Sequence, residues 1–380
     1  TPSPTPAPTP SPSTSTPPTP SPTPSPTPIP TLVPTITPPV EDCSDMVAYA
    51  DLKCANDATT TCIELRGPVD AIASKSIPVL ITAPHGGQLK PDNDYVDRNC
   101  AGNSGWVCSA DSYTLQLAEH VAMRFGLHYE GKCPWIVINH LHRSKLDANR
   151  ELPEAADGGA NAGDAWVAFH AFITQAQEKI NAIHGNDGNG IKGAMLDFHG
   201  YNGDDYLAGG APYTMYGYRL SENTLQQDPL PDAPTGSITH AAQKLGVGGL
   251  EDLVRGAKSL GALVPPLNSA TIKGDMPKNC GDPVPSPAIK SPISACPLNP
   301  PTLCNYRSGG YDLQAHEANV VNNNLNMNAI QVEVPRCIRK ASNWYTDVNV
   351  ADDVAIWDDF GDKISSGMCA WIDGVFGGPP

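Results

Sequence analysis

The chain has 380 residues, of which 40% are hydrophobic and 17% charged, and 40 acidic against 24 basic side chains give it a net charge of −16. This acidic balance argues against nucleic acid or anionic lipid as a partner, because both carry negative charge themselves. No run of 18 apolar residues occurs, so we expect no span across a membrane.

The first 40 residues differ in composition from the rest of the chain. They hold 17 of the 40 prolines, mostly in Thr-Pro and Ser-Pro repeats, and no charged side chain. Such a sequence favours an extended polyproline II rod, so residues 1–40 are predicted to be a stalk or linker and residues 41–380 an α/β domain. We expect O-glycosylation or proline hydroxylation of this stalk, and it offers a means of self-association or of attachment to a cell wall or surface.

Eleven cysteines are scattered along the chain without any CxxC pair. This spacing is poor for a structural zinc site and fits disulfides formed in an oxidising compartment, so we expect a secreted protein. Five bridges would leave one cysteine, either buried or bonded to a second chain. Two polar segments that carry cysteines, residues 42–66 and 88–110, are predicted to be held by disulfides.

Short apolar runs predict buried strands at residues 77–83, 135–139, 193–202, 213–218 and 329–334. Helical spacing of apolar residues predicts helices at 111–126 and 166–183, with weaker periodicity over 241–261. This alternation favours an α/β sheet with helices on its faces. Residues 262–304, rich in proline and cysteine, are predicted to form a long cross-linked excursion that shapes a substrate cleft.

Two histidines stand at predicted strand ends, where open α/β sheets place their ligands. His85 follows the first strand and precedes two glycines, and His199 lies on a later strand, two residues after Asp197. Because side chains two apart in a strand leave the same face, His199 and Asp197 form either half of a metal site or an ordinary buried hydrogen bond.

Each of several further polar residues has two possible roles. Asp111 either caps the helix that it precedes or points into a site. Arg143 and Arg150, with Asn149 beside them, suit two-point binding of a carboxylate or an oxyanion, or else form a solvated basic loop. Glu333 lies inside the last strand, so it either pairs with Arg336 or Arg339 or takes part in catalysis.

These residues form an ordered series: Pro84-His85-Gly86-Gly87, then Asp111, then Arg143 with Asp147-Ala-Asn149-Arg150, then Asp197-Phe-His199, and finally Gln331-Val-Glu333. The series resembles the N-formylglutamate amidohydrolase family, whose core is similar to that of zinc carboxypeptidases. The resemblance covers roughly residues 76–340 and implies a mixed, mostly parallel central sheet with helices on both faces.

The resemblance also implies one Zn²⁺ per chain, held by His85, His199 and Asp111, with Asp197 orienting a ligand from behind. Zinc carboxypeptidases carry a glutamate three residues after the first histidine, where this chain has Gln88. The third ligand must therefore come from elsewhere, and two other aspartates compete with Asp111 for that place, Asp94 and Asp97.

By the same resemblance, Glu333 is the general base that takes a proton from water and passes it to the leaving amine. Arg143 faces the oxyanion of the tetrahedral intermediate. Arg150 and Asn149 anchor the substrate carboxylate, with Arg336 as a further substrate-binding residue.

We therefore expect a secreted zinc-dependent hydrolase that cleaves an amide bond next to a free carboxylate, in an N-acyl amino acid, a C-terminal peptide or a γ-glutamyl substrate. The main alternative is an inactive hydrolase-fold surface or structural protein that assembles through its stalk or an unpaired cysteine. A carbohydrate-active enzyme is a third idea that the stalk suggests, but carboxylates such as Glu151 and Glu154 are too generic to support it.

Overall fold

The computed structural model describes residues 42–91, 95–188, 190–201, 213–225, 227–232, 236–277, 280–283, 309–316, 325 and 327–377. The predicted stalk and residues 284–304 of the predicted excursion lie outside the described residues.

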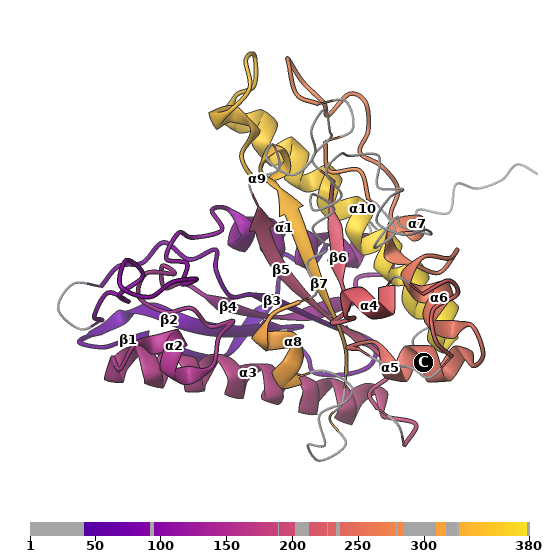
Figure 1. Cartoon of the computed structure of the whole chain (residues 1–380), viewed down its shortest axis with the longest axis horizontal. Helices are drawn as coiled ribbons and strands as arrows, with labels where there is room; N and C mark the ends of the chain where they lie inside the picture. The colour runs from indigo at the N-terminus through magenta and orange to yellow at the C-terminus, as the bar shows by residue number, and fades with distance from the viewer. Residues whose placement is uncertain are drawn as a thin grey trace, which may run out of the picture. The chain divides into compact units, whose positions relative to one another are not determined.

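Seven strands form one mixed sheet in the order β1-β2-β4-β3-β5-β7-β6 (Figure 1). In chain order these strands are β1 (Val47–Cys54), β2 (Asp57–Gly67), β3 (Ser76–Ala83), β4 (Cys133–Asn139), β5 (Ala194–Tyr201), β6 (Met215–Gly217) and β7 (Asn328–Pro335). The four central strands β4, β3, β5 and β7 run parallel, and the remaining pairings are antiparallel. The predicted mixed α/β sheet is confirmed.

The parallel strands are buried along almost their whole length, which explains why β3 and β4 read as apolar runs, and why β5 and β7 read as apolar segments interrupted by a few polar residues. The β1–β2 hairpin at the edge was not predicted. Its strands keep many exposed positions, so the segment 42–66 looked polar in the sequence.

Helices cover both faces of the sheet, as predicted. Helix α3 (Ala160–His184) packs on one face, and α1 (Thr114–His128) packs on the other, with α10 (Val350–Phe376) against α1 (Figure 1). Both predicted helices exist, but α1 begins three residues after Asp111, and Gly126 lies within it rather than ending it. No helix was predicted from the sequence for residues 350–376, which form α10.

Alternation along the strands divides the apolar core into two layers. On β5, Leu196 and Phe198 belong to the layer beneath α1 and α10, whereas Met195 belongs to the layer beneath α3. Because alternate residues of a strand share a face, Asp197 and His199 lie on the α3 side of the sheet, at the carboxyl end of β5.

Shorter helices complete the described fold: α2 (Leu152–Ala156), α4 (Glu222–Leu225), α5 (Thr239–Leu245), α6 (Gly249–Val254), α7 (Leu260–Leu263), α8 (Tyr311–His316), α9 (Arg336–Arg339) and the 3₁₀ helix η4 (Ala341–Asn343). Helices α5, α6 and α7 account for the periodicity predicted over 241–261. Across the described helices, none is both long and apolar enough to cross a membrane.

Four disulfides hold the described chain: Cys43–Cys133, Cys54–Cys62, Cys100–Cys108 and Cys280–Cys337. Both polar segments that were predicted to be held by disulfides carry them. Among the described cysteines, Cys369 is free and buried. The last two, Cys296 and Cys304, lie outside the described residues.

Candidate metal centre

The two histidines come from the ends of neighbouring parallel strands, β3 and β5. His85 lies in the turn that follows β3, and the next residue, Gly86, allows that turn to touch the start of α1. A Cβ atom on Gly86 would lie 2.3 Å from the backbone nitrogen of Leu115. Glycine at this position therefore lets the histidine turn and the amino end of α1 approach each other.

Three donor atoms converge in front of these strand ends. Nδ1 of His85 lies 3.1 Å from Nδ1 of His199, and Oδ2 of Asp111 lies 3.3 Å from each. Ligand atoms about 2.0–2.1 Å from a tetrahedral zinc ion are separated from one another by roughly 3.3 Å. The triangle therefore has the dimensions of one face of a tetrahedral zinc site, and these three residues are a group that could hold a metal ion.

Asp111 enters this triangle through its side chain and does not cap α1. The N-cap is Tyr113, whose backbone has φ of 68°. The backbone nitrogen of Asp111 donates to the carbonyl of His85 at 3.1 Å, and its Oδ2 accepts a hydrogen bond from the nitrogen of Gly200 at 3.2 Å. Of the two readings of Asp111, the structure supports the one in which it points into a site.

Of the two competing aspartates, Asp97 is described, and it does not join the group. Asp97 is 69% exposed and pairs with Lys145 at 3.1 Å. Asp94 lies outside the described residues.

A second carboxylate stands behind each imidazole. Nε2 of His85 lies 2.6 Å from Oδ1 of Asp147, and Nε2 of His199 lies 2.8 Å from Oδ2 of Asp197. Oδ1 of Asp197 accepts a further hydrogen bond from the hydroxyl of Thr82 at 2.7 Å. A neutral imidazole that donates through Nε2 presents a lone pair at Nδ1, which is the form that a metal requires.

The converging atoms are all acceptors in that form, so the triangle needs a cation or a proton at its centre. Burial alone would raise the pKa of Asp111, but hydrogen bonds from His199 and His85 hold it well below its usual range. Burial alone would lower the pKa of His199, but Asp197 and Asp111 raise it well above its usual range. A divalent cation would compete with the proton on the histidine Nδ1 atoms, because both bind the same lone pairs.

Glu333 lies beside this group on β7. In the parallel ladder His199 pairs with Glu333 and Asp197 pairs with Gln331, so both β7 side chains lie on the α3 side of the sheet. Oε1 of Glu333 accepts a hydrogen bond from Nε2 of Gln331 at 2.7 Å, and Oε1 of Gln331 accepts one from the nitrogen of Gly310 at 2.8 Å. The glutamate is thus buried and held on a rigid strand.

Arg143 reaches both the triangle and the carboxylate behind it. Its Nε donates to Oδ2 of Asp147 at 2.9 Å, and its Nη1 to Oδ1 of Asp111 at 3.4 Å. Burial alone would raise the pKa of Asp147, but His85 and Arg143 hold it below its usual range.

The remaining predicted substrate residues surround the same space. Arg150 donates from Nε to Oε1 of Glu154 at 2.9 Å. Nδ2 of Asn149 lies 3.0 Å from Nε2 of His199, while its Oδ1 accepts from the nitrogen of Asp312 at 2.8 Å. The amide of Asn149 therefore packs directly on a predicted metal ligand.

Two other cations expected near Glu333 have their own contacts. The guanidinium of Arg336 lies over the ring of Trp344, 4.3 Å from its centre. Arg339 donates to the backbone carbonyls of Val334, Ser112 and Tyr201.

One cavity of about 770 Å³ brings these groups together. Eight of the nine predicted site residues line it: His85, Asp111, Arg143, Asn149, Arg150, His199, Glu333 and Arg336. The ninth, Asp197, lies behind His199. The lining carries four arginines and one lysine against the two carboxylates of Asp111 and Glu333, so the cavity is locally basic in an acidic protein.

The prediction from sequence gave no role to Asp147, although it belongs to the Asp-x-Asn-Arg motif quoted above. Its contact with His85 joins residues 62 positions apart, so neither spacing nor periodicity could reveal it. The one feature of the sequence that could have indicated a role for Asp147 is its place in the polar segment that directly follows the strand predicted at residues 135–139.

Comparisons with known proteins give structural similarity without sequence similarity. No protein-family model and no curated protein sequence matches the chain. Similar solved structures include a gene product of Agrobacterium tumefaciens, at 12% identity over 81% of this chain and 94% of that chain, with a TM-score of 0.38. Another is N-formylglutamate amidohydrolase from Ralstonia eutropha, at 11% identity over 82% and 97%, also with a TM-score of 0.38. A third is a protein named as a candidate metallopeptidase from Shewanella amazonensis, at 12% identity over 87% of each chain, with a TM-score of 0.33.

Proposed function

We propose that this protein is a zinc-dependent hydrolase that cleaves an amide bond next to a free carboxylate. The observation that carries the proposal is the triangle of His85, Asp111 and His199 at the spacing of a tetrahedral zinc site, with Glu333 on the adjacent strand. Two imidazoles and one carboxylate are a ligand set that catalytic zinc uses, with a position left for water or substrate.

The charge of the cavity supports a substrate that bears a carboxylate. The cavity is lined by the cations of Arg143, Arg150, Arg336, Arg339 and Lys340, although the whole chain carries a net charge of −16. A guanidinium binds a carboxylate through two parallel hydrogen bonds. Arg150, supported by Asn149 and with Arg336 nearby, is our choice for the anchor, and the substrate classes are N-acyl amino acids, C-terminal peptides and γ-glutamyl compounds.

Each group would then have one task. When bound, the zinc ion supplies Lewis acidity, which polarises the scissile carbonyl and makes water more acidic. Glu333 accepts the proton of the attacking water and returns it to the leaving amine. Arg143 donates to the oxyanion that forms on the carbonyl oxygen. Asp147 and Asp197 keep the two imidazoles in the tautomer that presents Nδ1.

We also propose that the protein is secreted. Its four described disulfides fit an oxidising compartment. O-glycosylation of residues 1–40 and their use in self-association or surface attachment are parts of the same proposal. The alternative of an inactive surface protein that assembles through a cysteine draws no support from Cys369, whose thiol is buried.

The test is to measure metal content and hydrolysis on the same preparation. The full chain, purified without chelator, should contain about one zinc ion, the stoichiometry of a catalytic site. A panel of N-acyl amino acids, C-terminal peptides and γ-glutamyl compounds should reveal turnover that stops on chelation and returns with zinc. Zinc-loaded protein that hydrolyses nothing on the panel would favour the inactive scaffold, and protein that binds no zinc would refute the metal site itself.

A further inference from the structure

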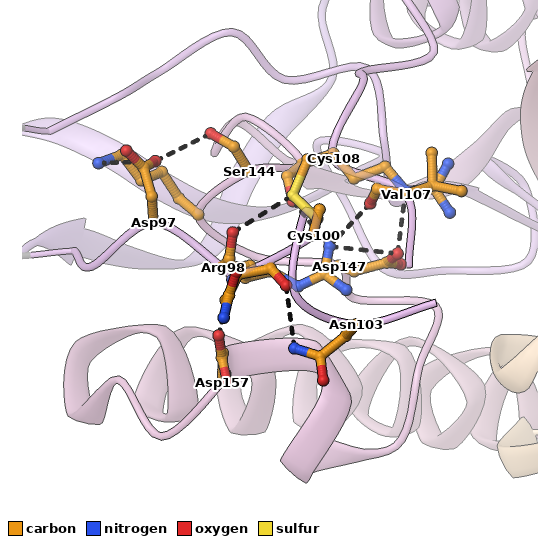
Figure 2. Close-up of a disulfide and its surroundings, with 12 residues drawn as sticks. Asp97, Arg98, Cys100, Asn103, Val107, Cys108, Ser144, Asp147 and Asp157 are labelled. Carbon is orange, nitrogen blue, oxygen red and sulfur yellow. Dashed lines mark hydrogen bonds and ion pairs between the residues drawn. A yellow bond between two sulfur atoms is a disulfide. The ribbon is translucent and has the colours of Figure 1, made fainter. Parts of the chain in front are cut away.

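A disulfide-closed loop forms one wall of the proposed active site. Residues 95–110 belong to the segment between the histidine turn and α1, and we call them the disulfide loop. The Cys100–Cys108 bridge closes residues 100–108 of it into a ring (Figure 2). The proposed ligand Asp111 follows Cys108 by three residues. Residues after the bridge or directly before it line the cavity, namely Val107, Ser109 and Ala110.

Arg98, within this loop, points inward and holds three stretches of backbone together. Its side chain is buried, with no exposed fraction. Nη1 donates to the carbonyls of Val107 at 2.9 Å and Arg143 at 3.0 Å, and Nε donates to the carbonyl of Glu154 at 3.0 Å. Its guanidinium also lies 5.2 Å from the ring centre of Trp106. A buried cation with this many partners fixes the loop on the segment that carries Arg143.

The same guanidinium continues a line of contacts to a proposed metal ligand. Nη1 of Arg98 lies 3.5 Å from Oδ2 of Asp147 (Figure 2), and Oδ1 of Asp147 lies 2.6 Å from Nε2 of His85. Asp147 is fully buried, and the same Oδ2 also accepts a hydrogen bond from Nε of Arg143 at 2.9 Å. Its two oxygens are thus held between two guanidinium groups on one side and the imidazole of His85 on the other.

Both cysteines of the bridge contact the backbone of Arg98. The backbone nitrogen of Cys100 donates to the carbonyl of Arg98 at 2.9 Å, and Sγ of Cys108 lies 3.6 Å from the same carbonyl oxygen. Both ends of the bridge therefore contact Arg98. The carbonyl of Val107, which Arg98 binds, directly precedes Cys108.

We propose that Arg98 is a positioning residue for the metal centre, acting through Asp147 on His85, and that the Cys100–Cys108 bridge holds Arg98 in place. This inference rests on the proposed function, because it takes His85 as a zinc ligand. It adds two features to that function, a buried arginine and a disulfide, neither of which touches the metal.

The chain offers a matched control for each feature. Cys54–Cys62 has the same sequence separation of 8 as Cys100–Cys108, so each closes a loop of equal length and the chain-entropy contributions should be similar. Arg255 is also a buried arginine that donates to backbone carbonyls, those of Leu225 and Gln227, but it does not line the cavity.

The experiment measures zinc affinity by competition with a chromophoric chelator, and Tm of the zinc-free protein, on the full chain. Arg98→Gln and the double variant Cys100→Ser with Cys108→Ser should bind zinc about 10–100-fold more weakly, as for other residues that support metal ligands. Arg98→Lys keeps a positive charge beside Asp147 but lacks the planar guanidinium, so zinc affinity should fall less than in Arg98→Gln. Arg255→Lys and the pair Cys54→Ser with Cys62→Ser should lower Tm while leaving zinc affinity unchanged.

If Arg98→Gln does not fold, the disulfide variants decide the matter. Equal zinc affinity in the wild type and both loop variants, with Tm lowered as in the controls, would mean that Arg98 and the bridge serve stability alone, and would overturn the inference. Wild-type protein that binds no zinc would instead overturn the proposed function, and this inference with it.

Discussion

Glu333 pairs with His199 across two parallel strands, so the proposed base stands next to a proposed zinc ligand by the register of the sheet alone. Because both residues lie on central strands, their separation is fixed by main-chain hydrogen bonds rather than by a loop. This pairing makes Glu333 the first residue to test.

Replacing Glu333 by glutamine should lower kcat by about 10²–10⁴-fold, the usual contribution of a general base. Glutamine keeps the size and shape of the side chain, so zinc affinity should not change. Kinetics on the best substrate of the panel, with zinc content measured on the same sample, checks both expectations. A variant with wild-type kcat would show that another group takes the proton.

The carboxylates behind the histidines should control zinc affinity rather than the proton transfer itself. Asp147→Asn and Asp197→Asn should each weaken zinc binding by about 10–100-fold, because the imidazole loses a charged acceptor that fixes its tautomer. Asp358→Asn is the control, since Asp358 pairs with His120 and Arg124 away from the cavity. Titration against a competing chelator gives the affinities, and a loss no greater than in the control would argue against this role.

Loss of the Arg150 guanidinium should act on substrate binding. A hydrogen bond to a charged group contributes about 1.5–3 kcal/mol, so Arg150→Ala should raise KM by roughly 10–100-fold. Arg150→Lys should recover part of this, because it restores the charge without the planar fork. Arg124→Ala provides the control, because Arg124 pairs with Asp358 of α10 and does not line the cavity. If KM for a carboxylate substrate is unchanged in Arg150→Ala, the anchor lies elsewhere in the cavity.

Acid should destabilise the fold through His170, a buried residue of α3. Burial lowers the pKa of His170 from 6.5 to about 4. Nε2 of this ring donates to the carbonyl of Ala148 at 3.1 Å, so Nδ1 accepts from Nε2 of His316 at 2.8 Å. The contact with His316 requires His170 to be neutral, because a protonated Nδ1 cannot accept a hydrogen bond, whereas the bond to Ala148 does not depend on the charge of the ring.

Because the folded-state pKa lies below the unfolded value, the unfolded chain binds more protons between pH 6.5 and pH 4. The free energy of unfolding should therefore fall as the pH drops through this window, by at most roughly 3 kcal/mol from His170. The free energy of unfolding, measured by urea denaturation at several pH values, should change less steeply with pH for His170→Gln than for the wild type. His128→Gln, at the end of α1, should leave the slope as it is, and an equal slope in all three proteins would exclude His170 as the source.

The sequence alone predicted the elements that are buried on both sides. Strands β3, β4, β5 and β7 are rich in apolar residues because helices cover both faces of the sheet there, and the polar residues of β5 and β7 line the site or lie behind it. The β1–β2 hairpin escaped prediction because its exposed positions break that pattern. The helix was predicted to begin at Asp111, whereas α1 begins at Thr114. The residues alone left open whether the Asp111 carboxylate caps the helix or points into a site.

Site residues could be predicted from the sequence where they stand at the end of a strand or on one. They could not be predicted where their role depends on contacts between distant loops. His85, His199 and Glu333 stand at strand ends or on a strand, and the sheet brings them to one cavity. The contacts of Asp147 with His85 and Arg98 join separate loops, and no period in the sequence predicts which loops meet.

Helix α10 has a consequence for how the chain folds during synthesis. It packs along α1, and many of its apolar side chains lie in the core layer on that face of the sheet, among them Ile356, Phe360, Ile364, Met368 and Ile372. Until residues 350–376 have left the ribosome, the apolar side chains of α1 that pack against α10 face water. All the strands of the sheet are therefore synthesised before α10 can pack. A nascent chain halted before residue 350 should expose this apolar surface and be recognised by chaperones.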